Sequence, residues 1–212
     1  MFKITEISPQ QKGSLLNVFV NGEYAFSADS GFIVDEDIFV GRLLDDGAFT
    51  ALKTAAGVRK AMRHALFLLE HRDFSKKELA TRLEEKGYEE DFAAAAAEKI
   101  AAMGYIDDRR YAERLVERKK NKVGEQQIRY ELSKAGISRK DADDILAEMY
   151  DESSDGVAVV LKEMRRKLKG EIPEDRKAQA KLFNSFRAKG FTFETVKAAY
   201  EKYCENEDLP ID

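Results

Sequence analysis

The 212-residue chain has no tryptophan, one cysteine, two histidines and three prolines. Because a disulfide needs two thiols, the single Cys204 excludes an internal disulfide framework and is typical of a reducing cytoplasm. Three prolines and 13 glycines exclude collagen-like stretches and favour helix. No run approaches the roughly twenty apolar residues of a membrane span, and the first residues lack the apolar block of a signal peptide. We therefore expect a soluble cytoplasmic protein.

Residue patterns that carry catalysis are also scarce. There is no GxxxxGK[ST] phosphate loop and no GxGxxG after a strand. His64 and His71 are seven residues apart and can share a helix face, but nothing supplies further metal ligands, so we interpret them as surface or packing residues. Asp107 and Asp108 suit helix capping better than acid–base chemistry, and Cys204 has no identifiable base partner. We expect no enzyme activity, no cofactor and no metal.

The strongest positive feature is a glycine that ends a helical run and precedes an apolar residue. It occurs at Gly87, Gly136 and Gly190, which are 49 and 54 residues apart. Apolar residues also recur four and eight positions before each glycine and thirteen after it. They are Leu83, Leu79 and Ile100; Leu132, Ile128 and Met149; and Phe186, Leu182 and Tyr203. A unit of about fifty residues therefore occurs three times, which indicates a stacked helical array.

Each unit is expected to hold three helices. Ser75 and Glu78 form a capping box at the start of one helix, and Ser138 and Thr192 are predicted to cap two others. The predicted units are residues 59–103, 104–150 and 151–212, the last with a connection around Pro173 and a polar tail expected to fray.

Residues 1–58 differ from the repeats. Asn21-Gly22 lies between two β-rich runs and supplies the two positive-φ residues of a tight hairpin turn. Residues 3–7 alternate like a further strand, and residues 30–40 and 47–56 predict short helices. The predicted fold class is mostly α: a tandem array of three three-helix repeats, preceded by a small α+β module containing a β-hairpin.

The net charge of −4 is unevenly distributed. Residues 1–58 carry four basic and eight acidic side chains, whereas the repeats are near neutral. An overall pI near 5.5 argues against a dedicated nucleic-acid binder but not against a local basic surface. The third helix of each unit is rich in acidic residues, which phosphate would repel, so these helices are not expected to read a DNA groove.

Two basic clusters occupy the first helices of the second and third units. The first contains Arg109, Arg110, Arg114, Arg118, Lys119, Lys120 and Lys122, and the second Lys162, Arg165, Arg166, Lys167 and Lys169. Residues 110, 114 and 118 share one helix face, while Tyr111, Leu115 and Val116 are expected to face inward. One such cluster is as readily a solvated face, but two at equivalent places favour a surface for nucleic acid or an acidic protein.

Tyrosines near the first cluster could also serve as base-stacking platforms. Tyr105, Tyr111 and Tyr130 have helical spacing, which favours core packing over stacking. We therefore expect these three rings inside the repeats.

Three segments carry a family resemblance: HRDFSKKELATRLEEKGY, MGYIDDRRYAERLVERK and VGEQQIRYELSKAGIS, in that order. Over residues 59–150 the chain resembles the RecX family of bacterial recombinase regulators, and the three tandem units extend the match more weakly. Residues 1–58 look like the extension of some members. The connection around Pro173 and the aromatic Tyr200 and Tyr203 depart from the family pattern.

The resemblance implies a non-catalytic regulator that binds the RecA recombinase filament on single-stranded DNA. It would inhibit ATP hydrolysis, strand exchange and the co-protease function behind the SOS response, and so modulate DNA repair. The basic clusters would then meet an acidic filament surface or DNA phosphate. Two alternatives are a nucleic-acid-binding protein that competes for single-stranded DNA, and a passive helical scaffold. A monomer is expected because no exposed heptad seam is present.

Overall fold

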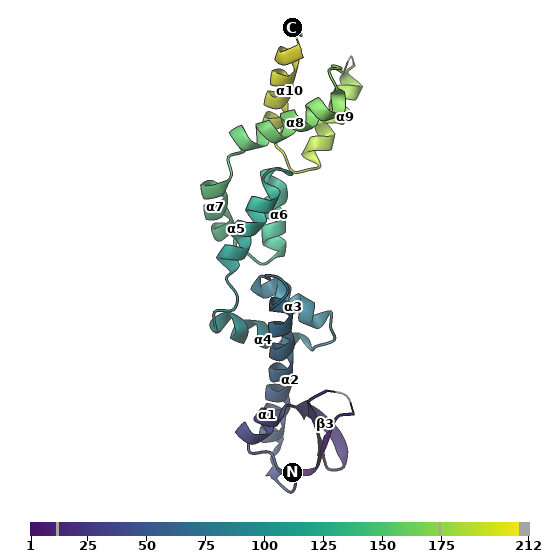
Figure 1. Cartoon of the computed structure of the whole chain (residues 1–212), viewed down its shortest axis with the longest axis vertical. Helices are drawn as coiled ribbons and strands as arrows, with labels where there is room; N and C mark the ends of the chain where they lie inside the picture. Colours follow the sequence, from purple (N-terminus) through teal and green to yellow (C-terminus); the bar gives the residue numbers. More distant parts are fainter. Residues whose placement is uncertain (12, 174, 208–212) are drawn as a thin grey trace. The chain divides into compact units, whose positions relative to one another are not determined.

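The computed structural model describes residues 1–11, 13–173 and 175–207. They form two compact units that divide between Asp107 and Asp108, and Figure 1 shows their helices and strands. Residues 208–212, the end of the tail for which we expect fraying, lie outside the described residues.

The N-terminal module begins with an antiparallel sheet, in which the described strands have the order β3-β2-β1-β4. The strands are β1 (Phe2–Pro9), β2 (Leu16–Val20), β3 (Glu23–Ala28) and β4 (Leu43–Leu44). The predicted hairpin is confirmed, because Asn21 and Gly22 have φ values of 52° and 85°. The Asn21 side chain also accepts the backbone N–H of Lys3 at 2.9 Å, which joins the turn to β1.

Two predicted helix boundaries in this module are wrong. The helix expected over residues 30–40 is α1 (Ser30–Asp35), and it ends early where Asp37 takes a positive φ of 50°. The helices expected over residues 47–56 and from residue 59 are one continuous α2 (Asp46–Leu69), so residue 58 lies within a helix. Gly57 does not interrupt α2. A Cβ there would be 2.5 Å from the Phe92 ring, so the glycine permits close packing of a later helix.

Arg59 of α2 holds the module against this helix. Its Nε and Nη2 donate to the Asp29 carboxylate at 3.0 and 2.9 Å, and its Nη1 donates to Asp35 at 2.9 Å. Asp29 also caps α1 by accepting the N–H of Phe32 at 2.9 Å. Burial raises the pKa of Asp29, but the Phe32 hydrogen bond and the Arg59 guanidinium outweigh it, so this pKa lies below its ordinary value of 3.8.

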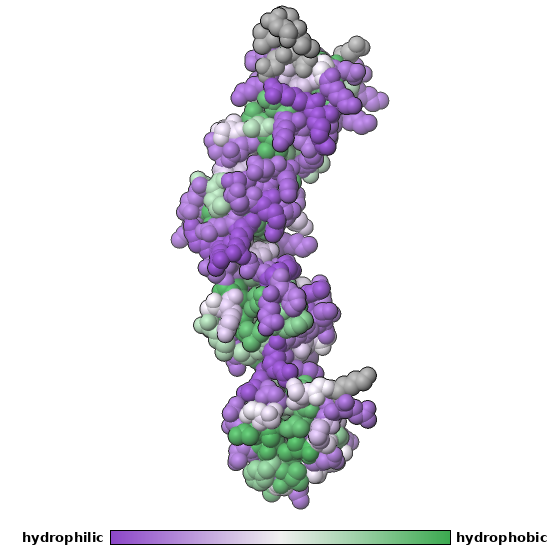
Figure 2. Space-filling view, in the orientation of Figure 1, coloured by the Kyte–Doolittle hydropathy of each residue, from purple (hydrophilic) through white to green (hydrophobic). Residues whose placement is uncertain are grey.

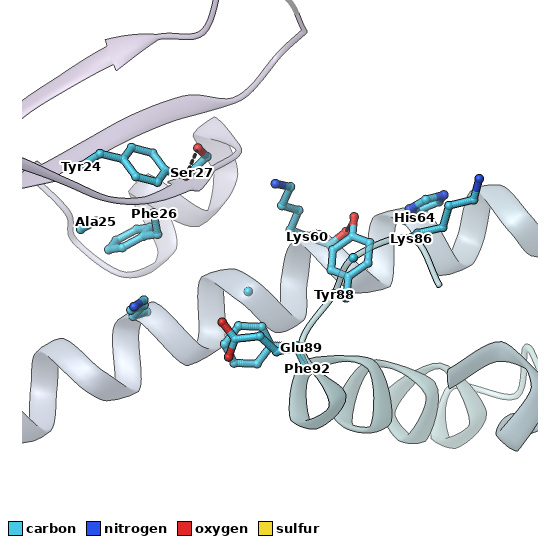
Figure 3. A pocket seen from close by; sticks show the side chains of 13 residues that line it. Tyr24, Ala25, Phe26, Ser27, Lys60, His64, Lys86, Tyr88, Glu89 and Phe92 are labelled. Atoms are coloured by element: carbon cyan, nitrogen blue, oxygen red, sulfur yellow. Dashed lines mark hydrogen bonds between the residues drawn. The ribbon is translucent and has the colours of Figure 1, made fainter. Parts of the chain in front are cut away.

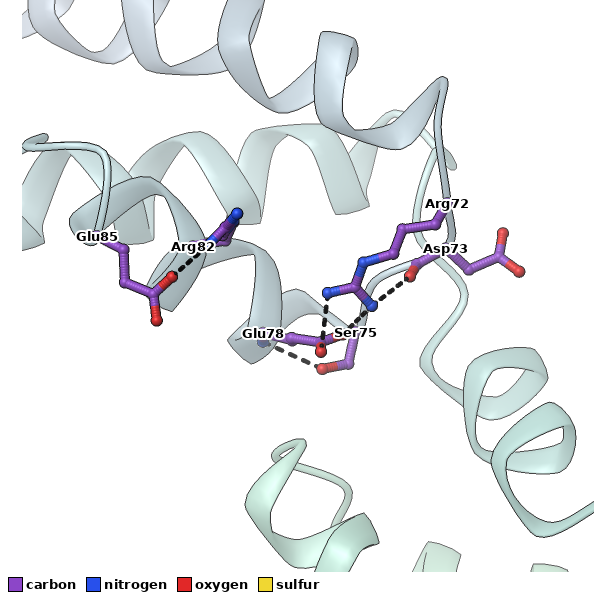
Figure 4. A network of polar contacts seen from close by, with 6 residues as sticks. All are labelled: Arg72, Asp73, Ser75, Glu78, Arg82 and Glu85. Atoms are coloured by element: carbon purple, nitrogen blue, oxygen red, sulfur yellow. Dashed lines mark hydrogen bonds and ion pairs between the residues drawn. The ribbon is translucent and has the colours of Figure 1, made fainter. Parts of the chain in front are cut away.

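The first repeat packs the second half of α2 against α3 (Lys76–Glu84) and α4 (Glu90–Ala102). The predicted cap at Ser75 is confirmed, because its hydroxyl accepts the N–H of Glu78 at 3.1 Å. Figure 4 shows the surrounding contacts, in which the Glu78 carboxylate accepts from Arg72 at 3.1 and 3.3 Å. The Arg72 guanidinium also lies 3.7 Å from the centroid of the Phe74 ring. These contacts fix the connection between α2 and α3.

The second unit contains the other two repeats. Its elements are α5 (Asp108–Lys119), α6 (Glu125–Lys134), α7 (Arg139–Met149), the π-helical turn η1 (Glu152–Gly156), α8 (Val157–Leu168), α9 (Arg176–Arg187) and α10 (Phe193–Glu207). The predicted caps are present: Ser138 accepts the N–H of Asp141 and Thr192 that of Thr195, each at 3.1 Å. Each repeat encloses its own apolar core.

The three glycine stops adopt the same geometry. Gly87, Gly136 and Gly190 have φ values of 89°, 83° and 89°, which L-residues rarely adopt. The residue after each glycine donates its N–H back across the helix end, a pattern typical of Schellman caps. These bonds run from Tyr88 to Leu83 at 3.2 Å, from Ile137 to Leu132 at 3.0 Å, and from Phe191 to Phe186 at 3.4 Å. All three acceptor residues are fully buried, so the predicted repetition is confirmed.

The second and third repeats meet through backbone at the start of α6. The N–H of Gly124 donates to the Lys189 carbonyl at 3.0 Å, and that of Gln126 to the Gly190 carbonyl at 3.2 Å. A Cβ on Gly124 would overlap with the Gly190 carbonyl group. The carbonyl-rich end of α9 thus satisfies the free N–H groups that begin α6, an attractive arrangement of opposite helix ends.

Candidate partner-binding surface

The face of α5 that the sequence predicted to be basic is exposed. Leu115 and Val116 are buried and Tyr111 is half-buried, as expected for the inward face. Arg110, Arg114 and Arg118 are exposed. The helical spacing therefore predicted both faces of α5.

Several predicted contact residues of this cluster already have carboxylate partners. The pairs join Arg109 to Glu113 at 3.0 Å and Glu148 at 2.8 Å, Lys119 to Glu131 at 2.9 Å, and Lys120 to Glu117 at 2.8 Å. Each carboxylate offsets the positive charge beside it, so these side chains attract a distant anion less strongly than unpaired ones.

The second cluster lies on the outer face of α8. Val160 and Met164 are buried on the inner face, whereas Lys162, Arg165, Arg166 and Lys167 are exposed. Arg166 pairs with Glu163 at 3.0 Å, and the Lys167 ammonium lies 5.0 Å from the centroid of the Phe186 ring. The other three residues of this cluster, Lys162, Arg165 and Lys169, are exposed.

The ion pairs divide the predicted residues into two groups. Within the residues that the structure describes, Arg118, Lys122, Lys162 and Arg165 have no ion-pair partner. Lys167 and Lys169 also lack one, but Lys167 lies over the Phe186 ring and Lys169 follows the end of α8. We call the first four residues the unpaired basic set; two belong to each predicted cluster, and all four are exposed. Figure 2 shows a largely hydrophilic surface over the second unit in this view, which suits a polar or anionic partner. That these residues contact a partner stays a prediction.

The expectation for the tyrosines is wrong at two positions. Tyr105 and Tyr130 are 60% and 63% exposed, so they do not pack in a core. Tyr130 lies midway between Ile128 and Leu132, both fully buried, and a residue two positions from the buried face of a helix points away from it. In contrast, Tyr203 is buried, and its hydroxyl accepts the N–H of Gly170 at 2.9 Å.

The histidines make ordinary packing contacts. His71 Nδ1 lies 2.8 Å from the Phe67 carbonyl oxygen, and the His64 ring is edge-on to Tyr88 with centroids 5.6 Å apart. Among the described residues, no group of three or more His, Cys, Asp or Glu side chains could hold a metal ion. No helix in the same part of the chain has the length and apolar character needed to cross a membrane.

Sequence reasoning missed a second basic surface, which lies in the first unit. Lys53, Lys60 and Lys86 line a cleft of about 330 Å³ together with aromatic side chains. Lys53, Lys60 and His64 are spaced at seven and four residues, which would have placed them on one face of a helix. That signal was hidden because α2 was predicted as two separate helices.

Comparison with known proteins matches family models to the first two repeats. A model of the RecX first three-helix domain matches residues 61–99, and one of the RecX second three-helix domain matches residues 107–146. A regulatory protein RecX of Listeria monocytogenes is 31% identical over 202 residues, covering 93% of this chain and 74% of that protein. The chain belongs to the RecX family. Another RecX, from Caldanaerobacter subterraneus, is 27% identical over 92% of this chain and 97% of its own.

Solved RecX structures share the fold. A crystal structure of regulatory protein RecX covers 97% of this chain and 100% of its own, with a TM-score of 0.64 and 24% identity. RecX from Lactobacillus salivarius covers 71% of this chain and 99% of its own, with a TM-score of 0.56 and 26% identity. The RecX relatives of this chain are named regulatory proteins, which assigns this chain to a family of regulators.

Proposed function

We propose that this RecX protein is a non-catalytic cytoplasmic regulator that binds the RecA recombinase filament. Binding inhibits the filament's ATPase, strand-exchange and co-protease activities, and so modulates DNA repair and the SOS response. Membership of a family of regulatory proteins supports the regulatory role. The sequence also contains neither a GxxxxGK[ST] phosphate loop nor a GxGxxG after a strand.

The observation that carries the binding surface is the unpaired basic set on and beside α5 and α8. Exposed ammonium and guanidinium groups without a local carboxylate keep their attraction for an anionic partner, which raises the rate of encounter. Each repeat of such an array contacts only its neighbours, so the outer helix faces stay available. The partner groups would be carboxylates of the filament or phosphates of its DNA.

The proposal is tested by titrating preassembled RecA filaments with the full chain. Sedimentation of the filaments is expected to carry the chain with them, and ATP turnover is expected to fall as the chain is added. Filaments that leave the chain in the supernatant at low salt would contradict the proposal.

A second candidate function is competition for single-stranded DNA without contact with RecA. The exposed rings of Tyr105 and Tyr130 favour it, because bases stack on exposed aromatic faces. In that case the chain shifts single-stranded DNA in a gel without RecA, with a steep dependence on salt. Inhibition would then disappear when excess single-stranded DNA is supplied.

A further inference from the structure

The cleft of the first unit has walls from three separate segments. α2 contributes Lys53, Gly57, Lys60 and His64; β3 contributes residues 24–27; and the connection into α4 contributes residues 86–89 and Phe92. Figure 3 shows Tyr24 and Ser27 on the sheet side, opposite Lys60 and Tyr88 on the helical side. Because Gly57 has no Cβ, the Phe92 ring packs directly against the backbone of α2 at this place.

The charge of the cleft is positive. Lys53, Lys60 and Lys86 are all exposed, and among the described residues none of them has an ion-pair partner. Glu89 is the one acidic side chain among the lining residues. Burial lowers the pKa of His64, and the positive charges of Lys86 and Arg82 lower it further. Three lysines against one glutamate give the lining of the cleft a net positive charge.

Two aromatic rings stand beside these lysines in fixed orientations. Tyr24 is 57% exposed, and its hydroxyl shares a hydrogen bond with Ser27 Oγ at 2.8 Å. The Phe19 ring contacts it edge-on, with centroids 6.1 Å apart. The Tyr88 hydroxyl donates to the Lys60 carbonyl at 3.4 Å, which ties that ring to α2. A ring that is already fixed loses little conformational entropy when a ligand stacks on it.

We propose that this cleft binds a segment of single-stranded nucleic acid. Phosphates lie beside Lys53, Lys60 and Lys86, and a base stacks on the exposed face of Tyr24. Lys53 and Lys60 are two helical turns apart, about 10.5 Å along α2, so they meet different phosphates of one strand. An acidic peptide would match the charge but leave the Tyr24 face unused, and a duplex presents no free base face to stack on it.

This site is separate from the unpaired basic set, which lies in the second unit. Its test needs no RecA, so its outcome is independent of the proposed binding to the filament. Single-stranded DNA binding through Tyr105 and Tyr130, the second candidate function, is distinguished from it by variants of the cleft, which neither tyrosine lines. The full chain is titrated into a fluorescein-labelled single-stranded oligothymidylate, and binding is followed by fluorescence anisotropy at several salt concentrations.

The first comparison removes charge. The double variant Lys53→Gln/Lys60→Gln is expected to bind about tenfold more weakly and to lower the salt slope by about 1.4, since each phosphate contact on a single strand contributes about 0.7. The control Lys77→Gln/Lys99→Gln removes two exposed lysines of the same unit that lie outside the cleft. It is expected to bind like wild type. Equal binding by both double variants would overturn the proposal.

The second comparison removes the ring. Tyr24→Ala is expected to weaken binding by about tenfold, because stacking on one aromatic side chain is worth that much or more. Tyr24→Phe keeps the ring and is expected to bind like wild type. If Tyr24→Phe and Tyr24→Ala lose equal affinity, the hydroxyl contact with Ser27 matters and stacking is excluded.

Cross-linking locates the strand, and competition identifies its chemistry. A strand carrying 5-iododeoxyuridine is expected to photo-cross-link to peptides that contain Tyr24 or Tyr88. Cross-links confined to the second unit would contradict the proposal. Unlabelled oligothymidylate is expected to displace the probe better than thymidine monophosphate at equal nucleotide concentration, and better than polyglutamate. Equal displacement by the mononucleotide or by polyglutamate would show a nucleotide pocket or a peptide site instead.

Discussion

At Arg59, one guanidinium bridges two carboxylates of the N-terminal module. The Asp29 carboxylate accepts two N–H groups of Arg59 and also caps α1. One aspartate therefore both pairs with α2 and begins α1. Its side chain is 23% exposed, which makes the pair stronger than a fully solvated one. Replacing this one charge therefore tests how the module is joined to α2.

The first prediction concerns Asp29→Asn, which keeps a capping oxygen but removes the charge. Because the pKa of Asp29 is lowered on folding, its stabilisation is present above its ordinary value of 3.8 and is lost as the pH falls through the folded pKa. At pH 7 the variant is expected to lower the free energy of unfolding of the first unit by about 1 kcal/mol. The measurement is urea unfolding followed by the amide NMR signals of β2 and β3.

The difference between wild type and Asp29→Asn is expected to shrink at pH values below 3.8. Glu23→Gln is the matched control, since Glu23 is exposed at the start of β3. Its effect at pH 7 is expected to be small, as for most exposed positions. A constant Asp29→Asn difference between pH 7 and pH 3 would argue against the charge pairing.

At the scale of elements, the helix-ending glycines allow a paired test. Gly87 and Gly190 share a φ of 89°, but a Cβ on Gly87 meets nothing within 4 Å, whereas one on Gly190 would lie 2.5 Å from the Gln127 nitrogen. Gly87→Ala is expected to destabilise its repeat by about 1–2 kcal/mol through backbone strain alone. Gly190→Ala adds a steric overlap and is expected to cost more. Thermal unfolding of the two variants compares them, and equal losses would contradict this account.

Local pattern predicted the repeats because their signals lie within one helix and its ends. The three glycines, the capping hydroxyls and the buried positions four residues before each glycine all act over a short span of chain. Local pattern predicted two separate helices on either side of Gly57, but α2 continues through it, and this glycine makes room for the Phe92 ring, 35 positions later. Tertiary packing, rather than helix propensity, decides that position.

The candidate site was only partly predictable for the same reason. The basic clusters and the outward face of α5 followed from helical spacing. Helical spacing did not predict which charges stay unpaired, because some partners are distant in the sequence. Arg109, for example, pairs with Glu148, 39 residues away. The cleft of the first unit could not be predicted from local pattern either, because β3, α2 and the start of α4 contribute to it from distant parts of the sequence.

At the scale of the molecule, the junction between the second and third repeats depends on Gly124. This residue has a φ of −78°, which alanine adopts without strain, so the effect of Gly124→Ala comes from its overlap with Gly190. We expect the variant to separate α6 from the end of α9 while each repeat keeps its own core. Hydrogen exchange at the Gln126 amide is expected to become faster, and proteolysis between the repeats easier.

Gly47→Ala is the control for this prediction. Gly47 lies in the first turn of α2, where a Cβ would be 3.4 Å from the Asp45 side chain, an ordinary contact. It is expected to leave the exchange of Gln126 unchanged. If Gly124→Ala also leaves that amide as protected as in wild type, the backbone junction does not hold the two repeats together.

We propose that the unpaired basic set holds this RecX protein on the RecA filament. The most direct test compares two fourfold variants by ATP turnover of preassembled filaments. One carries Arg118→Gln, Lys122→Gln, Lys162→Gln and Arg165→Gln; the other carries Lys134→Gln, Lys140→Gln, Arg176→Gln and Lys181→Gln, exposed positions of the same unit outside the set. Wild type and the second variant are expected to inhibit alike, and the first to need at least about tenfold more protein. Equal inhibition by both variants would show that these four basic residues do not hold the protein on the filament.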